Sequence, residues 1–338
     1  MALDSKWHVI IVPGLFATVL EKRGRRIWPL PFRPDEMKYD PALPDDGVVP
    51  VKVIKWAMHD LYCGLERFLR RFATVDYCPF DWRRPVEDEA VRVSDLVRTA
   101  PADAQIALVG HSLGGLVAKR SLLQDPTVHE RVRYFFSLGT PWLGAPVAFD
   151  ELHNNMRILG IPFPTAVAGR TMPAGYEVLP SRLYFQERTY LQRDGVDLSY
   201  EESVEAADEA SPGSYYTRYN EGQLQHWVYQ PFGPDLTHCI VAGTGERTGI
   251  RIQVEGNKVR IVGWERTGDG TVPGISQAWH ASGATVRYLH ESHVSLAAAK
   301  PVWRWIRHTL LTGKPDEFEE GGLRRMSLVD LGGTRQPA

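Results

Sequence analysis

The sequence has few cysteines, little net charge and no long apolar run. Cys63, Cys78 and Cys239 are an odd and widely spaced set, which argues against a disulfide framework and against a metal-binding knuckle. Buried free thiols in a reducing compartment are the expected alternative. The formal net charge of −2 and a pI near 6.6 give no indication of a polyanionic partner, so we expect no nucleic acid binding.

Other signatures are also lacking. Met1–Lys6 leads directly into an apolar segment, without the basic and then apolar pattern of a leader. Since no apolar run approaches the length that crosses a bilayer, the sequence predicts a cytoplasmic protein. Its glycine-rich turns carry neither the lysine of a phosphate loop nor a dinucleotide fingerprint, and we therefore expect no cofactor and no metal.

What is present is the composition and rhythm of a globular α/β protein. Of the 338 residues, 43% are hydrophobic and 24% are charged, which allows a sizeable core. Apolar runs alternate with segments of helical spacing, which predicts a mostly parallel sheet with helices on both faces and with the carboxyl ends of its strands at one edge. The expected strands are 7–12, 74–78, 105–109, 132–138, 239–242 and 285–289, and the expected helices are 61–72, 88–99, 116–124 and 294–311.

One stretch points to chemistry. Val109–Gly115 contains the pattern Gly-x-Ser-x-Gly, centred on Ser112. An apolar run, Gln105–Val109, precedes it and predicts a buried strand, and the helical run Leu116–Gln124 follows at once. A serine between a strand and a helix lies on a tight, strained turn that exposes its hydroxyl at the edge of the sheet. We therefore predict that Ser112 is a nucleophile; the alternative is a glycine-rich turn with an incidental serine.

Three segments break the alternation, and the end of the chain differs in composition. Residues 17–58 (the first inserted segment) and 144–236 (the second inserted segment) follow strands that end at the active edge, and connections of this length predict a cap over Ser112. Residues 250–264 alternate around a turn and predict a β-hairpin. We expect the catalytic domain to span 1–312 and residues 313–338 to form a loosely ordered tail.

A serine hydroxyl needs a base, and the base needs a carboxylate to orient it. In the strand-and-turn arrangement that the serine motif predicts, the chain order is Ser, acid, His. His293 lies just before the last expected helix and is favoured as the base, with His290 as the alternative. The acid stays open between Glu246, which directly follows a strand, and Asp269, which lies in a Gly-Asp-Gly turn and has a modest lead.

A developing oxyanion needs two backbone N–H donors. One is expected at Leu113, after the nucleophile, and the other at Leu15, in the loop after the first strand. The side chains of Leu15 and Phe16 would then line an apolar acyl pocket, although ordinary core packing is as good an explanation for Phe16. Trp142 is a second candidate for contact with substrate.

Several motifs together resemble one family. In this order along the chain they are Ile11–Leu15, Pro79–Arg83, Val109–Gly115, Ser137–Trp142, Gly243–Gly245, Gly268–Val272 and His293–Val294. The set, spread from Val9 to about Leu311, resembles the lecithin:cholesterol acyltransferase family, which includes phospholipid:diacylglycerol acyltransferases and lysosomal-type phospholipases A. The resemblance implies an α/β-hydrolase fold and places the acid on Asp269 rather than on Glu246.

The chain also departs from this family. Its best-known members are secreted or lumenal and have disulfides near the active site, whereas the cysteines here lie elsewhere. Phe80 replaces the usual tyrosine before Asp-Trp-Arg, and the inserted segments show no resemblance. We expect Asp81 and Arg83 to form a structural ion pair rather than catalytic groups.

The sequence therefore predicts a serine esterase or acyltransferase that acts on small-molecule, lipid-like carboxylic esters and passes the acyl group to water or to an alcohol. A dedicated acyltransferase and a non-catalytic binding protein on the same fold are the alternatives. The 10 tryptophans allow peripheral contact with a lipid surface, although tryptophan lies more often in cores. The oligomeric state stays open.

Overall fold

The centre of the protein is a six-stranded sheet in which all neighbouring strands run parallel. This computed structural model describes residues 6–30, 33–54, 61–155, 157–158, 161–162, 166–279, 283–318 and 322–326. In spatial order the strands are β15 (Thr285–His290), β12 (Thr237–Thr244), β7 (Val132–Leu138), β6 (Gln105–His111), β1 (Trp7–Val12) and β5 (Thr74–Tyr77).

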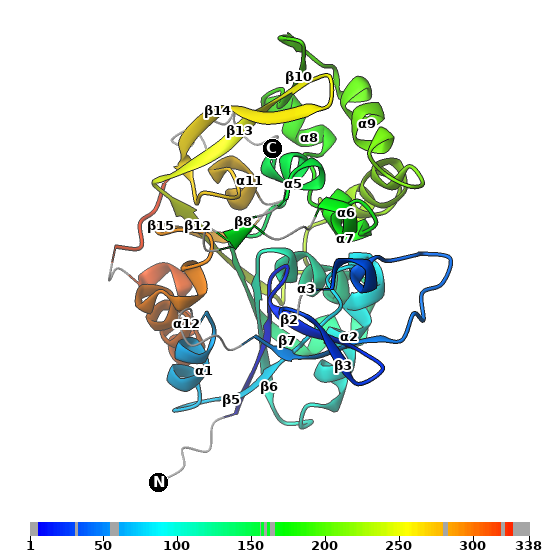
Figure 1. Cartoon of the computed structure of the whole chain (residues 1–338). Coiled ribbons are helices and arrows are strands. Elements are labelled where there is room, and N and C mark those ends of the chain that lie inside the picture. The colour runs from blue at the N-terminus through cyan, green and yellow to red at the C-terminus, as the bar shows by residue number, and fades with distance from the viewer. Residues whose placement is uncertain are drawn as a thin grey trace.

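Helices cover both faces of this sheet (Figure 1). They are α1 (Cys63–Leu69) and α12 (Lys300–Thr312) on one face, and α2 (Val86–Thr99), α3 (Leu113–Gln124) and α4 (Pro126–Arg131) on the other. Because successive side chains of a strand point to opposite faces, Val9 and Ile11 of β1 pack with α1 and α12, whereas Ile10 and Val12 pack with α2 and α3. The central strands are therefore mostly apolar and mostly buried on both faces.

The carboxyl ends of the strands meet at one edge, and the chain turns there into the candidate functional loops. Ser112 stands between β6 and α3, Leu15 follows β1, and His293 follows β15. A parallel sheet, helices on both faces and a serine on the turn from strand to helix define an α/β-hydrolase fold, as the sequence predicted.

The first inserted segment forms a small antiparallel sheet in its described part, with residues 31–32 and 55–58 outside the description. Its elements are β2 (Thr18–Lys22), β3 (Arg25–Trp28), η1 (Pro34–Met37) and β4 (Val48–Val53). The predicted hairpin is confirmed and is longer than expected, from β13 (Glu246–Glu255) to β14 (Lys258–Gly268).

The second inserted segment consists mostly of short helices, and Figure 1 shows it beyond the carboxyl edge of the sheet together with the hairpin. Residues 156, 159–160 and 163–165 of it lie outside the described ranges. Its elements are α5 (Val147–His153), β8 (Arg157–Ile158), β9 (Ile161–Pro162), α6 (Ala166–Gly169), α7 (Pro173–Glu177), α8 (Arg182–Glu187), β10 (Leu191–Arg193), β11 (Val196–Asp197), α9 (Tyr200–Glu209), the π-helix η2 (Tyr216–Leu224) and α10 (Gln225–Trp227). The remaining short helices of the described chain are α11 (Gly274–Ala278), η3 (Leu296–Ala298) and η4 (Pro315–Glu317).

The last long helix differs from its prediction. The sequence predicts a helix over 294–311, but α12 begins at Lys300, and only the short turn η3 precedes it. Pro301 is the reason, because proline fits the first turn of a helix, and neither its ring nor its missing N–H is tolerated farther inside one.

The described part of the expected tail packs closely rather than loosely. Arg324 and Tyr288 exchange two backbone hydrogen bonds, of 2.9 Å each, so the tail pairs with β15. Phe318 and Leu323 are buried, which explains the docking, because an apolar side chain that leaves water stabilises the segment that carries it. Residues 319–321 and 327–338 lie outside the description.

Three structural absences apply to the described residues only. The three cysteines lie in these ranges, and none of them forms a disulfide. No described helix is both long and apolar enough to cross a membrane. A search of the same ranges finds no group of three or more His, Cys, Asp or Glu side chains that is arranged to hold a metal ion.

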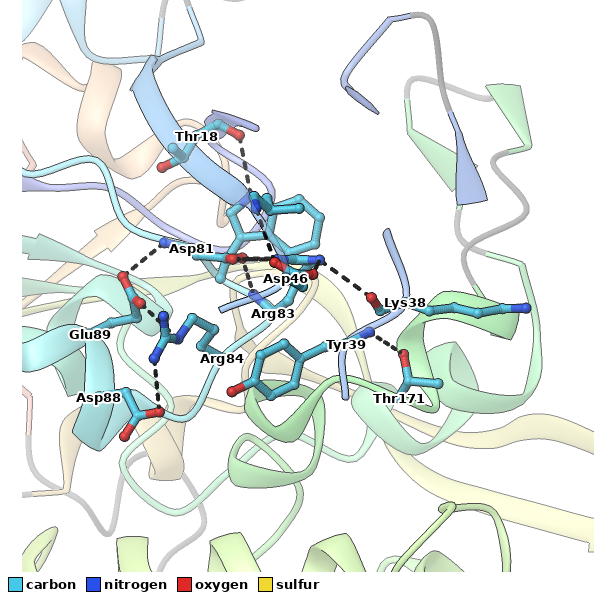
Figure 2. A network of polar contacts seen from close by, with 12 residues as sticks. Thr18, Lys38, Tyr39, Asp46, Asp81, Arg83, Arg84, Asp88, Glu89 and Thr171 are labelled. Atoms are coloured by element: carbon cyan, nitrogen blue, oxygen red, sulfur yellow. Dashed lines mark hydrogen bonds and ion pairs between the residues drawn. The ribbon is translucent and has the colours of Figure 1, made fainter. Parts of the chain in front are cut away.

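The expected ion pair between Asp81 and Arg83 is confirmed and belongs to a larger network (Figure 2). The Arg83 guanidinium is fully buried, and its Nη2 lies 2.6 Å from Asp81 Oδ2 while its Nη1 lies 2.9 Å from Asp46 Oδ2. Nη1 also donates to the carbonyl oxygen of Lys38, at 3.4 Å. Burial acts to raise the pKa of Asp46, but the bond to Arg83 outweighs it and leaves that pKa below its ordinary value.

The same network reaches the second inserted segment. The backbone N–H of Tyr39 donates to Thr171 Oγ1, at 3.0 Å, and this bond joins the two inserted segments (Figure 2). Beside it, Glu89 accepts from the backbone N–H of Asp81, at 3.0 Å, and lies 3.3 Å from Arg84 Nε. Polar groups of three chain regions thus bond to one another, which ties the insertions to the core.

Replacing Arg83 by methionine is expected to lower the free energy of unfolding by about 3–5 kcal/mol, because Asp81 then stays buried without its cation. Denaturant unfolding followed by circular dichroism measures this loss. Arg25→Met is the matched control: Arg25 pairs with Glu36 at an exposed site, where loss of the pair is expected to cost less than about 1 kcal/mol. Equal stability of the two variants would contradict a supporting role for the buried network.

Candidate active site

Ser112 lies on a strained turn at the carboxyl edge of the sheet. Its φ of 54° and ψ of −129° are unusual for a residue other than glycine, and such strain persists only where the surroundings enforce it. A Cβ on Gly110 would lie 2.6 Å from the Cα of Gly115, and one on Gly114 would overlap the carbonyl oxygen of Pro13. The two glycines of the motif are therefore required for the close approach of β1, β6 and α3.

Three side chains that lie far apart in the sequence form one hydrogen-bonded chain. His293 Nε2 lies 2.9 Å from Ser112 Oγ, and His293 Nδ1 lies 2.7 Å from Asp269 Oδ2. A carboxylate only accepts hydrogen bonds, so in neutral His293 the proton is on Nδ1 and Nε2 accepts from the Ser112 hydroxyl. This arrangement is suited to removing a proton from Ser112.

The turn around Asp269 holds its carboxylate in place. Oδ1 accepts from the backbone N–H groups of Thr271 and Val272, at 2.9 and 2.7 Å, and leaves Oδ2 for the imidazole. The backbone N–H of His293 also donates to the Asp269 carbonyl oxygen, at 2.7 Å. Asp269 is 1% exposed, so water competes little for these bonds. The orientation of the imidazole is thus determined at two points.

The electrostatics of the site favour a positive charge on His293. Burial acts to lower the pKa of His293, but the Asp269 carboxylate and, to a lesser extent, Glu151 outweigh it and raise that pKa above its ordinary value. A proton that reaches Nε2 is therefore stabilised there.

The structure does not bring the two alternative residues to the serine. Glu246 begins β13, and His290 is an exposed residue at the end of β15. In the described chain, neither of them hydrogen bonds to Ser112 or to the His293 ring. The sequence left two candidates for the base and two for the acid. Among these four residues, His293 and Asp269 are hydrogen bonded to each other, and His293 also lies within hydrogen-bond distance of Ser112.

The two predicted oxyanion donors lie on either side of Ser112. The Leu113 amide is in the first turn of α3, where the positive end of the helix dipole lies, and Leu15 follows Gly14, where a Cβ would come within 3.0 Å of Ser112 Cβ. Within the described chain, neither the Leu15 nor the Leu113 N–H has a hydrogen-bond acceptor. Both are therefore available to a bound oxygen.

An aromatic cluster supports the Leu15 loop. Phe16 has a φ of 62°, and its carbonyl oxygen accepts from the Trp28 indole N–H, at 2.8 Å. The Phe16 ring also packs against Trp28 and Trp82, with centroids 5.2 and 4.5 Å away. The strained loop is therefore held by a tryptophan of the first inserted segment and one that follows β5.

Sequence reasoning missed a buried chain of hydrogen bonds behind the serine. The Gly14 N–H donates to Tyr62 Oη at 3.0 Å, Tyr62 Oη lies 2.7 Å from His111 Nδ1, and His111 Nε2 lies 2.9 Å from the His293 carbonyl oxygen. Burial and then the proximity of His293 lower the pKa of His111 to about 3, so its ring is neutral. Nε2–H then donates to the carbonyl, and Nδ1 accepts from Tyr62. This chain of hydrogen bonds joins the Leu15 loop to the His293 loop.

Trp142 does not lie where substrate contact requires it. It is 1% exposed, its ring packs edge-on against Phe135 and His238, and the Lys119 ammonium lies 5.4 Å from its centroid. Its position explains the difference from the prediction: the turn after β7 directs this side chain inward, between the sheet and Lys119 of α3. We therefore place Trp142 in the core.

A small cavity lies beside the candidate site. Its volume is about 40 Å³, and its walls combine Leu15 and Phe16 with side chains of α5, with Gly169 and Gly175 of α6 and α7, and with Met172 and Val178 on either side of α7. All lining residues are apolar or glycine except Glu151 of α5. The structure thus brings Phe16 to a cavity wall, and Glu151 is a polar lining residue that no sequence motif indicated.

The fold and this arrangement define the class: the chain has an α/β-hydrolase fold, and the nucleophile position of that fold holds a serine. Comparison with protein families matches a PGAP1-like alpha/beta domain to residues 86–158, from the start of α2 through Ser112 to β8. The match covers well under half of the chain, so it is a similarity of that segment. No curated protein matches the sequence.

Solved structures that resemble this chain do so at low sequence identity, and one of the three that follow has a TM-score above 0.5. A chain in the crystal structure of the Tle4–Tli4 complex superposes with a TM-score of 0.60 and 11% identity, over 93% of this chain and 99% of that one. Lipase B of Aspergillus fumigatus gives 0.44 and 12%, over 98% of this chain and 58% of that one. The mature Bacillus licheniformis lipase BlEst2 gives 0.45 and 12%, over 92% and 94%. At these identities the likeness concerns the fold alone.

Proposed function

We propose that this chain is a serine ester hydrolase that acts on small carboxylic esters through a covalent acyl-enzyme. The observation that carries the proposal is the continuous hydrogen-bonded chain from Ser112 through His293 to Asp269 at the carboxyl edge of an α/β-hydrolase sheet. Nucleophile, base and orienting acid are recognised by such geometry rather than by sequence position.

In the proposed reaction, Ser112 Oγ attacks the ester carbonyl carbon while His293 Nε2 takes the hydroxyl proton. Asp269 stabilises the resulting imidazolium, and the amides of Leu15 and Leu113 bind the oxyanion. Each such donor contributes about 3 kcal/mol to transition-state stabilisation. The tetrahedral intermediate then expels the alcohol, which receives the proton from His293. Water, activated by the same imidazole, next attacks the acyl-enzyme and releases the acid and Ser112.

The substrate side of the proposal depends on the second inserted segment. Its helices α5, α6 and α7 supply the cavity wall that faces Leu15 and Phe16, which supports the prediction of a cap. The apolar lining agrees with a lipid-like ester, and the motif resemblance to the lecithin:cholesterol acyltransferase family points the same way. That subfamily, a lipid-surface contact and a cytoplasmic location stay predictions.

The proposal is tested with a radiolabelled acyl ester and an excess of an alcohol acceptor. We expect labelled free acid as the main product and transferred ester as a minor one, because no second substrate is needed for attack by water. Nearly complete transfer to the alcohol would instead identify a dedicated acyltransferase, in which a dry site favours the alcohol. Absence of both products, together with no labelling by a fluorophosphonate probe, would indicate a non-catalytic binding protein.

A further inference from the structure

The cavity beside the Leu15 loop contains one polar side chain that has no partner among the described residues around it. Glu151 lies on α5 and lines this cavity, where every other lining residue is apolar or glycine. In the described residues its carboxylate has no hydrogen bond and no ion pair, although its neighbour Asp150 accepts from Asn154 Nδ2 at 2.8 Å. A carboxylate in an apolar cavity that has no hydrogen-bond partner lowers the stability of the fold, because its lost hydration is not replaced. A hydrogen-bond donor on a bound substrate would remove this cost.

Glu151 is partly buried, and the fully buried carboxylates of Glu89 and Glu177 are satisfied internally. Glu89 bonds to a backbone N–H and to two arginines, and Glu177 accepts from the backbone N–H of Val86, at 2.9 Å. Glu151 therefore differs in kind from them. Burial, and then the neighbouring Asp150, raises the pKa of Glu151 to about 7, and the nearby imidazole of His293 acts against this shift. The carboxyl thus lies within electrostatic reach of the candidate base.

We propose that Glu151 is a specificity-determining residue for the ester reaction proposed above: it accepts a hydrogen bond from a hydroxyl or ammonium group of the substrate portion that enters the cavity. The inference rests on the proposed function. A site built to bond a polar group discriminates strongly against the analogue that lacks it, because the site's own group then stays unpaired. The preferred ester therefore has a donor near its reacting carbonyl, in either its acyl or its alcohol part.

The cavity is small, about 40 Å³, and it is partly open to its surroundings. A short polar branch of the ester can therefore lie beside Glu151 while the rest of the molecule extends through the open side.

The test uses three pairs of esters that differ in the donor or charge. p-Nitrophenyl 3-hydroxybutyrate against p-nitrophenyl butyrate examines the acyl part, and glycerol monobutyrate against propyl butyrate examines the alcohol part. Butyrylcholine against 3,3-dimethylbutyl butyrate separates positive charge from hydrogen bonding. We expect the wild-type kcat/KM to favour the hydroxyl member of one pair by about tenfold or more.

Variants of Glu151 test whether this residue causes the preference for the hydroxylated ester. Glu151→Leu is expected to reduce the preference to about one, by slowing the hydroxylated ester and accelerating the plain one, and Glu151→Gln should retain part of it because an amide oxygen still accepts. Glu151→Leu should also raise Tm, because an unpaired carboxylate is removed from an apolar site, whereas loss of a structural glutamate would lower Tm. Glu201→Leu, at an exposed position of α9, is the matched control and should change neither the substrate preference nor Tm.

Two failures are distinguishable. If a fluorophosphonate probe still labels Ser112 and plain esters are hydrolysed, but Glu151→Leu leaves every ratio unchanged, the role of Glu151 is refuted while the proposed function stands. If the wild-type protein neither reacts with the probe nor hydrolyses any ester, the proposed function is refuted, and the inference with it.

Discussion

Replacement of Ser112 by alanine is expected to lower the turnover of esters by about 10⁶-fold and to abolish covalent labelling by a fluorophosphonate. A loss of this size is expected because the nucleophile, base and acid act together. Without the Ser112 hydroxyl, His293 has no nucleophile to activate, and only substrate binding and the oxyanion donors still assist the attack of water. Because Ser112 lies on a strained turn that the flanking glycines allow, alanine there should not disturb the fold.

The measurement combines a spectrophotometric ester assay with probe labelling and peptide mapping. Ser121→Ala is the matched control, since Ser121 lies on the same helix α3 and its hydroxyl donates only to the Ala118 carbonyl, at 2.8 Å. This variant should keep both activity and labelling. A label that persists in Ser112→Ala, or that maps to another serine, would sink the assignment of the nucleophile.

Local patterns predicted the central sheet well. The strand expected at Val132–Leu138 has these bounds in the structure, because a buried parallel strand is rich in apolar residues and ends here at Gly139. The second inserted segment offered no comparable signal, since its short elements are held by distant partners. Asn220 of the π-helix η2, for example, donates its amide to the carbonyl oxygens of Tyr176 and Leu179, at 2.9 and 3.1 Å. Such bonds leave no periodicity in the sequence.

The residues of the candidate site that lie in local sequence motifs could be predicted, and those placed by tertiary packing could not. Ser112 could be singled out from a strand, a turn and a helix that adjoin in the sequence, whereas the choice of Asp269 needed the family resemblance. Tyr62 and Glu151 could not be predicted, because their surroundings are created only when α1 and α5 pack against the active edge. His111 lay inside the recognised motif, but its buried hydrogen bonds depend on the same packing.

Replacement of Asp269 by asparagine is expected to lower kcat by about 10⁴-fold while leaving probe labelling detectable but slow. The Asn amide donates to His293 Nδ1, which shifts the imidazole proton to Nε2, where it can no longer accept from Ser112. Glu246→Gln is the matched control and should change kcat little, because Glu246 does not hydrogen bond to the His293 ring or to Ser112 in the described chain. If instead Glu246→Gln caused the larger loss, Glu246 would be the acid.

The pH profile makes the same assignment independently of the rate. Activity needs neutral His293, so kcat/KM falls as the pH drops through the pKa of His293, which Asp269 and Glu151 hold above its ordinary value against the effect of burial. Removing the charge of Asp269 lowers that pKa, because burial then acts with less opposition. The acid limb of the residual activity should therefore move to lower pH in Asp269→Asn and stay in place in Glu246→Gln. An unmoved limb in Asp269→Asn would mean that a different pair of groups controls the proton on His293.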